Sequence, residues 1–191
     1  NRAWDAGMRY FDTAPYYGHG LSELRLGHYL RWRKRGDFVL SSKVGRVLKA
    51  AKRQDIDFKP WVDAAAFKPR FDYSYDGTMR SFEDSLQRLG LEYIDILFIH
   101  DCDVFTHGAE MQKVYYKQAM DGCYRALIEL REQGLVKAIG VGVNNWEIMP
   151  YFMKAGDFDT LLVAGRYTLL EQEALNELLP LCERRGTALV I

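Results

Sequence analysis

Short apolar runs with the composition of β-strands alternate along this chain with longer segments of helical periodicity. The runs are rich in β-branched, aromatic and leucine residues, which favour strands. Strands that alternate with helices form βαβ units, so the sequence predicts an α/β fold with a parallel sheet. We expect strands near residues 8–11, 38–42, 93–99, 137–143, 160–164 and 187–191, and helices near residues 22–35, 77–89, 110–133, 147–154 and 171–185.

The helix expected over residues 77–89 has the clearest pattern. Asp76 is placed to cap its N-terminus, and Gly90 supplies a C-terminal stop. Its apolar side chains fall on one face, as in a helix that packs on a sheet. These apolar side chains are Met79, Phe82, Leu86 and Leu89.

Pro180 interrupts the last helical pattern, where we expect it to kink or restart the helix.

The composition is that of an ordinary globular domain with no excess of charge of either sign. The 191 residues are 48% hydrophobic and 27% charged, and 26 basic residues balance 26 acidic ones. This balance gives no reason to expect nucleic acid or an anionic membrane as a partner. The basic cluster Arg31, Arg33, Lys34 and Arg35 is expected to be the solvated end of a helix stopped by Gly36.

The three cysteines, Cys102, Cys123 and Cys182, are odd in number and widely spaced. They indicate neither a disulfide framework nor a zinc site, and no metal is expected. No apolar stretch reaches the roughly 20 residues of a membrane helix, and no signal peptide opens the chain. The cytoplasm is therefore the expected compartment.

The topology of the sheet stays open at this level. The strands fit either an open doubly wound sheet or part of an eight-stranded barrel. A dinucleotide-binding GxGxxG after the first strand, a phosphate-binding GxxxxGK[ST], HExxH and GxSxG are all absent from the sequence. Their absence argues against nucleotide hydrolysis, zinc proteolysis and the usual serine hydrolases.

Polar residues follow four of the expected strands at their carboxyl ends: Asp12, Lys43, His100 and Asn144. In a parallel sheet these ends converge on one crevice or barrel mouth, where ligands and catalytic groups collect. The pattern therefore predicts an enzyme. Each residue alone has an ordinary structural explanation, such as a turn cap for Asp12 or a core histidine for His100.

Tyr17 supplies a proton donor or acceptor near this edge. Its usual pKa of about 10 is too high for catalysis at neutral pH unless a cation stabilises the phenolate. We expect Lys43 to lower the pKa of Tyr17, and Asp12 to keep the lysine charged and oriented. His100 is expected to donate to the substrate oxygen or to the phenol.

A long stretch from Gly45 to Tyr75 lies beyond the Lys43 strand and is expected to be irregular and rich in aromatic residues. Long loops in compact α/β domains are usually functional. We expect it to cover the substrate. Tyr16, Trp61 and Trp146 are the side chains predicted to pack on a sugar or pyridine ring, with core packing as the alternative for Trp146.

Four strings resemble the aldo-keto reductases in the family's order: YFDTAPYYGHGLSELRLG, VLSSKVGR, SFEDSLQRLGLEYIDILFIHD and VKAIGVGVNNW. The resemblance covers practically all of residues 1–191, as one domain. It implies a (β/α)8 barrel in which Asp12, Tyr17, Lys43 and His100 form the catalytic tetrad. It also implies that the first strand of the barrel precedes Asn1 and that the eighth follows Ile191.

The resemblance implies NAD or NADP as cofactor. Asn144 matches a residue that holds the nicotinamide, and Asp12 also lies on the cofactor side. Where many members have a glutamine, this chain has Ala164-Gly165-Arg166, so Arg166 is the remaining candidate for a cofactor contact.

Within the family, the chain is most similar to the branch that oxidises aldoses at the anomeric carbon. The implied substrates are L-fucose, L-galactose or D-arabinose, and the implied product is a lactone. Pyridoxal 4-dehydrogenase and a general aldehyde or ketone reductase are the alternatives. A non-catalytic, nicotinamide-sensing subunit is the alternative of another class.

Overall fold

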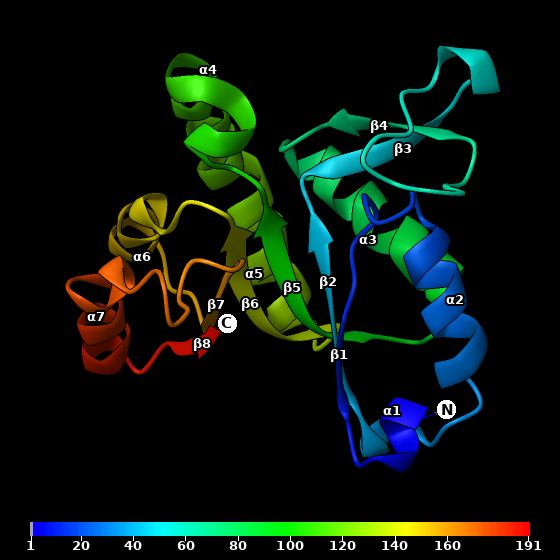
Figure 1. The fold of residues 1–191 in the computed structure, drawn as a ribbon, viewed down its shortest axis with the longest axis horizontal. Helices are drawn as coiled ribbons and strands as arrows, with labels where there is room; N and C mark the ends of the chain where they lie inside the picture. Colours follow the sequence, from blue (N-terminus) through cyan, green and yellow to red (C-terminus); the bar gives the residue numbers. More distant parts are fainter. Residues whose placement is uncertain (1) are drawn as a thin grey trace.

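The computed structural model describes residues 2–191, so Asn1, the first residue of the predicted domain, lies outside it. Within this range, six parallel strands form one sheet in the order β1-β2-β5-β6-β7-β8 (Figure 1). The predicted parallel α/β fold is confirmed, with strand ends that differ by one or two residues. The strands are β1 Tyr10–Asp12, β2 Val39–Val44, β5 Ile94–His100, β6 Val136–Val143, β7 Thr160–Val163 and β8 Ala188–Val190.

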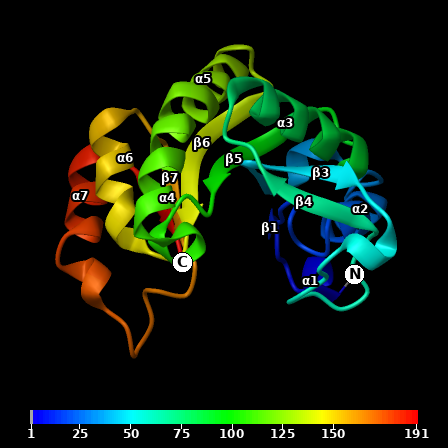
Figure 2. The same ribbon diagram turned by 90° about the horizontal axis from the view of Figure 1, so that it is seen from above.

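The sheet curls, and Figure 2 shows helices α3, α5, α6 and α7 on its outer side. A doubly wound sheet would carry helices on both faces, whereas a barrel carries them only outside. The curvature therefore favours the barrel over the open sheet. The helices are α1 Arg2–Asp5, α2 Leu21–Leu30, α3 Tyr75–Leu89, α4 Val104–Gln118, α5 Arg125–Glu132, α6 Met149–Ala155 and α7 Leu178–Arg185.

The main core lies between this sheet and the outer helices. Leu97 and Ile99 of β5 and Ile139 of β6 are fully buried there, as are Leu127 of α5 and Phe152 of α6. Strands buried on both faces read as continuous apolar runs, which explains why these strands were visible in the sequence. Among the described helices, none has both the length and the apolar character needed to cross a membrane.

Helix α3 begins two residues earlier than the sequence predicted. Ser74, and not Asp76, is the N-cap, because its side chain accepts a hydrogen bond from the backbone N–H of Gly77. Gly90 ends the helix in the left-handed conformation, as expected. Pro180 lies in the first turn of α7, where a missing N–H removes no helical hydrogen bond, so the helix restarts there.

The helix predicted over residues 110–133 is divided in the structure. Helix α4 starts at Val104, after an Asp103 cap, and Gly108 has a non-helical conformation inside it. A π-helical turn, η3 (Ala119–Tyr124), then connects α4 to α5. Both departures depend on local backbone geometry that hydrophobic periodicity does not report.

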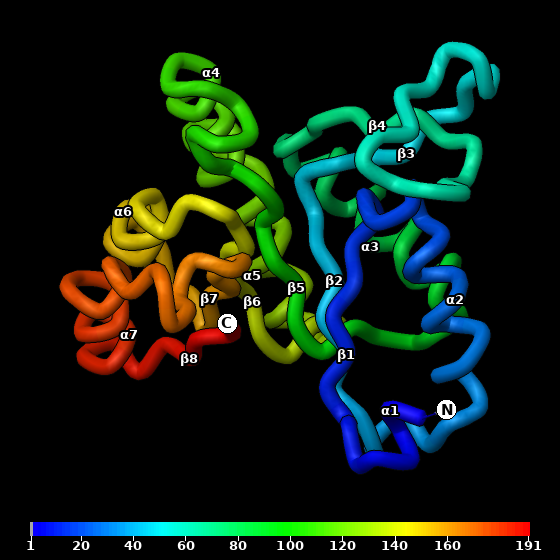
Figure 3. Tube along the Cα trace, viewed as in Figure 1, coloured from blue at the N-terminus to red at the C-terminus, as the bar shows by residue number. Residues whose placement is uncertain are grey.

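The stretch from Gly45 to Tyr75 is not irregular throughout, which corrects the prediction. It contains an antiparallel hairpin of β3 (Arg46–Ala50) and β4 (Phe67–Phe71). Pro69 within β4 made a strand assignment unattractive, and proline is tolerated here because this two-stranded sheet leaves β4 at an edge. Figure 3 shows the hairpin above the end of β2, beside the carboxyl ends of the strands.

The basic cluster after α2 is not simply a solvated helix end. Helix α2 stops at Leu30, and Arg35 lies in a separate 3-10 turn, η1 (Arg35–Asp37). There Arg35 forms a 2.5 Å ion pair with Asp95, whose side chain is only 5% exposed. Asp95 also accepts hydrogen bonds from the backbone of Leu40 and from Lys137, at 2.8 Å each. The cluster thus contributes a buried ion pair between η1 and β5.

We expect Asp95→Asn to destabilise the fold by about 3 kcal/mol at neutral pH, because it leaves the Arg35 guanidinium buried without a counter-charge. Burial alone would raise the pKa of Asp95, but the bonds from Lys137, Arg35 and Leu40 outweigh it and lower this pKa. The carboxylate therefore stabilises the fold above its unfolded pKa near 3.8 and loses this effect as the pH falls through the lower folded value.

Urea unfolding at several pH values would measure this difference. Asp121→Asn is the matched control, because Asp121 pairs with Lys117 on the surface. This variant should change the free energy of unfolding by less than about 1 kcal/mol. Equal unfolding free energies for Asp95→Asn and the unmodified protein at neutral pH would contradict the prediction.

Candidate active site

Asp12 and Lys43 lie side by side at the carboxyl ends of β1 and β2. Lys43 Nζ donates to Asp12 Oδ2 at 2.6 Å and to the Thr13 carbonyl at 2.8 Å. Ser41 Oγ donates to the other Asp12 oxygen at 2.5 Å. The lysine side chain is 1% exposed, and burial lowers its pKa while Asp12 opposes that change. The expected pairing of carboxylate and ammonium is present.

Tyr17 lies beside this pair, in the turn that precedes α2. Lys43 Nζ is 4.7 Å from the centre of the Tyr17 ring, and the ring of His100 is 5.8 Å away in an edge-to-face arrangement. The side chains of Asp12, Tyr17, Lys43 and His100 therefore gather around one point, although 88 residues separate the first from the last in the sequence.

The pKa of Tyr17 differs from the sequence prediction. Burial raises it far above its usual value, and the carboxylates of Asp12 and Asp101 raise it further. The guanidinium of Arg46 acts in the opposite direction. Lys43 Nζ lies 4.7 Å from the centre of the ring, and its charge does not offset burial, so the predicted net lowering is wrong. Tyr17 is therefore a protonated phenol at neutral pH in this structure.

A cavity of about 220 Å³ opens in front of Tyr17, Lys43 and His100. Two of the predicted substrate contacts, Tyr16 and Trp61, line it, and their rings meet edge to face at 5.4 Å. Trp61 comes from the connection between β3 and β4, as a covering loop would require. The cavity is further lined by Pro60, Asp101, Gly142, Val143, Asn144, Leu162 and Ala164.

Residues 1–191 match the sequence model of the aldo/keto reductase family over their whole length. The chain belongs to this family. The family resemblance stated from the four motifs is confirmed, and the clustered side chains are those that it singled out.

Two curated relatives and one solved structure show what this family member is similar to. Pyridoxal 4-dehydrogenase of Microbacterium luteolum is 44% identical over 98% of the chain and 57% of its own length. D-threo-aldose 1-dehydrogenase of a Pseudomonas species is 40% identical over 98% of the chain and 56% of its own length. The glycerol dehydrogenase of Gluconobacter oxydans superposes with a TM-score of 0.71 at 26% identity, over 98% of the chain and 49% of its own. The chain thus spans about half of these relatives.

The remaining predicted contacts divide between two cavities of this aldo/keto reductase. Asn144, at the end of β6, lines both the cavity at Tyr17 and a neighbouring one of about 300 Å³. Arg166 and Trp146 line only the second, where Arg166 forms an ion pair with Glu171 at 3.0 Å. The structure therefore does not bring Trp146 together with Tyr16 and Trp61, and its contact with substrate stays a prediction.

Two residues at the site were not identified from the sequence. Arg46 is buried and Asp101 half-buried beside His100, and they form a 2.8 Å ion pair. Arg46 lies three residues beyond Lys43, and Asp101 directly follows His100. The available signal was position, because each residue lies just beyond a strand end that already held a candidate catalytic residue. Both residues also lie within the family motifs that contain Lys43 and His100.

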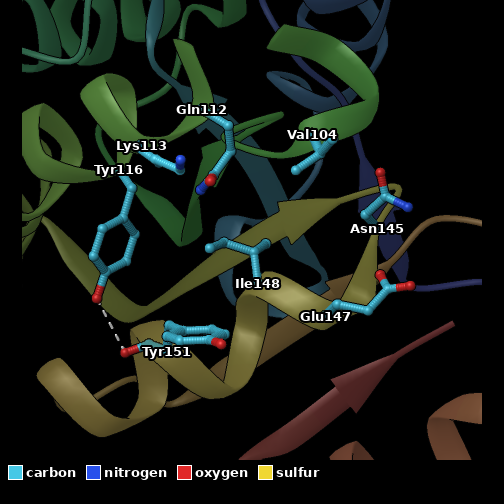
Figure 4. A pocket seen from close by; sticks show the side chains of 8 residues that line it. All are labelled: Val104, Gln112, Lys113, Tyr116, Asn145, Glu147, Ile148 and Tyr151. Atoms are coloured by element: carbon cyan, nitrogen blue, oxygen red, sulfur yellow. Dashed lines mark hydrogen bonds between the residues drawn. The ribbon is translucent and has the colours of Figure 1, made fainter. Parts of the chain in front are cut away.

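The fold also holds a larger cavity, of about 600 Å³, on its outside between α4 and α6. Figure 4 shows Tyr116, Gln112 and Ile148 facing it, with the Tyr116 hydroxyl bonded to the Tyr151 carbonyl. Asp12, Tyr17, Lys43 and His100 do not line this cavity. Its size alone therefore does not make it the candidate active site.

Proposed function

We propose that this protein is an NAD(P)-dependent oxidoreductase that oxidises an aldose at its anomeric carbon to a lactone. The observation that carries this proposal is the convergence of Tyr17, Lys43 and His100 on one small cavity walled by aromatic rings. The names of the two curated relatives, an aldose dehydrogenase and a pyridoxal dehydrogenase, support the reaction class.

The residues around the cavities fit a nicotinamide dinucleotide. Asn144 lies where the cavity at Tyr17 meets the second cavity, so one extended ligand can contact both. Its side-chain amide is a suitable partner for a carboxamide, and the cation of Arg166 suits a phosphate. Asn144 and Arg166, with Asp12 nearby, would hold the cofactor, which when bound accepts or gives the hydride.

Tyr17 is the proton donor in reduction and the proton acceptor in oxidation. In the reductive direction its phenol gives a proton to the carbonyl oxygen while hydride reaches the carbonyl carbon. Oxidation reverses both transfers: the phenolate takes the hydroxyl proton, and the hydride leaves the same carbon. Because the structure raises the pKa of Tyr17, it favours the protonated form that reduction needs. Lys43, which Asp12 holds in place, supplies the positive charge that stabilises the phenolate during oxidation.

Pyridoxal is the second candidate substrate, and one specific observation favours it: the relative at 44% identity is a pyridoxal 4-dehydrogenase. The aromatic walls of Tyr16 and Trp61 suit a flat pyridine ring as well as the apolar face of a sugar. Both substrates require the same hydride and proton transfers, so they differ only in the groups that the cavity must bind.

An assay of cofactor reduction with L-fucose, L-galactose, D-arabinose and pyridoxal, run with NAD and NADP on the complete protein, tests the proposal. We expect sustained turnover with an aldose, with pyridoxal as the competing substrate. Preference for pyridoxal would replace the aldose assignment and keep the oxidoreductase. Tight dinucleotide binding with no turnover on any carbonyl or alcohol would instead support a nicotinamide-sensing subunit and overturn the enzyme.

We propose the cytoplasm as the compartment. All three cysteines are buried and free, and no disulfide is formed among them. Free thiols are typical of proteins in reducing compartments.

A further inference from the structure

Arg46 is a buried cation that contacts the back of the candidate active site. It lies at the start of β3, directly after the turn at Gly45, and only 6% of the residue is exposed. Its guanidinium lies between two aromatic rings, 4.3 Å from the centre of Tyr16 and 4.4 Å from the centre of Phe71. It is not among the residues that line the cavity at Tyr17, so any effect on a substrate passes through its neighbours.

Two of these neighbours belong to the site. Arg46 Nη1 is 3.1 Å from Nδ1 of the His100 ring and 2.8 Å from Oδ2 of Asp101. A planar guanidinium can serve both partners at once because it carries several N–H donors in a fixed geometry. Asp101 has a left-handed backbone conformation, with φ of 51°, and its carboxylate pairs with the arginine.

The chemistry of this contact determines where the imidazole carries its proton. Arginine stays protonated in proteins and can only donate hydrogen bonds. Nδ1 of His100 must therefore accept, so it holds a lone pair, and the proton of the neutral ring is on Nε2. A doubly protonated ring would direct its Nδ1–H at the guanidinium. In agreement, burial holds the pKa of His100 well below its usual value, and the charges of Arg46 and Lys43 lower it further.

The Nε2–H that results is available to a ligand. His100 lines the cavity, and its Nε2 is 3.4 Å from Asp101 Oδ2, longer than a well-formed hydrogen bond. The main chain of His100 is held separately, because Tyr73 Oη donates to its carbonyl at 2.7 Å. The ring orientation is thus determined on its Nδ1 side, while its Nε2 makes no hydrogen bond with the described residues.

We propose that Arg46 is a positioning residue that holds His100 as the neutral Nε2–H tautomer, with Asp101 orienting the arginine. This arrangement aims a permanent hydrogen-bond donor at the substrate oxygen. The assignment of the tautomer depends only on the contacts described above. Its effect on catalysis rests on the proposed oxidoreductase function.

The test compares a charge-balanced double variant with a single variant that keeps the arginine. Arg46→Met with Asp101→Asn removes both charges, so no buried carboxylate is left unpaired. Asparagine is also suited to the left-handed conformation at position 101. Asp101→Asn alone is the matched control, because the bond from Arg46 to His100 remains possible.

Long-range ¹H–¹⁵N NMR of the histidine rings in the complete protein reports the tautomer directly. We expect an unprotonated Nδ1 and a protonated Nε2 for His100 in the unmodified protein and in Asp101→Asn. In the double variant we expect a mixture of tautomers. A proton on Nδ1 in the unmodified protein overturns the proposal, as does an unchanged tautomer in the double variant. If the double variant does not fold, the spectrum of the unmodified protein still decides.

Kinetics separate this proposal from the proposed function. We expect kcat in the double variant to fall in proportion to the fraction of His100 that lacks the Nε2–H, with a smaller change in Asp101→Asn, because an incorrect tautomer removes the donor. A rise in KM with kcat unchanged would contradict positioning through His100. If no substrate is turned over, the oxidoreductase proposal fails. The NMR experiment still tests the role of Arg46, because it does not depend on turnover.

Discussion

Replacing Tyr17 by phenylalanine is expected to lower kcat by about 10²–10⁴-fold in the complete protein, the usual contribution of a general acid or base. The variant removes one oxygen atom and keeps the ring that contacts His100 and Trp61 at 5.8 and 5.5 Å. Substrate and cofactor should therefore bind almost normally. Steady-state kinetics in both directions would measure the loss.

Tyr151→Phe is the matched control for this variant. Tyr151 is 64% exposed on α6, and it contributes only its backbone carbonyl to a hydrogen bond with Tyr116. It should retain full activity. A Tyr17→Phe variant that loses less than tenfold would show that another group carries the proton, and the proposed role of Tyr17 would have to be abandoned.

The second large effect is expected for Lys43→Met. Removing the ammonium takes away a cation that lies 4.7 Å from the centre of the Tyr17 ring, and leaves the phenolate without that stabilisation. The pKa of Tyr17, already raised by burial, should rise further. We expect oxidation to slow by about 10²-fold and its pH optimum to move upward, because a higher pH is then needed to form the phenolate.

A pH profile of kcat tests this directly. The fold should survive the change, since Asp12 keeps its bond from Ser41 and its side chain is 28% exposed to water. Lys68→Met, on the exposed side of β4, is the control and should leave the profile unchanged. An unaltered pH optimum in Lys43→Met would contradict a role for the lysine in the ionisation of Tyr17.

Several parts of the fold were predictable because they depend on local patterns. The strands that became β5 and β6 are largely apolar runs, and α3 has a one-sided apolar face, so these patterns are visible without knowledge of the tertiary structure. The hairpin of β3 and β4 was missed because its pairing joins residues about 20 positions apart around Pro69. The division of α4 from α5 was missed because a π-helical turn leaves no periodic signal.

The candidate site was likewise predictable only in part. Its members could be named from the sequence because parallel strands bring their carboxyl ends to one edge, whatever the details of packing. Trp146 was grouped with Tyr16 and Trp61 by residue type alone. The structure separates them, because the turn after β6 directs Trp146 to the neighbouring cavity.

The order of residues alone determined that this chain forms parallel α/β units and carries Asp12, Tyr17, Lys43 and His100 at their ends. Only the tertiary structure decided the protonation states, because they depend on burial and on charges that are distant in sequence. Burial raised the pKa of Tyr17 against the expected effect of Lys43. Arg46, 54 residues before His100, reaches its imidazole only after β3 folds over the end of β2.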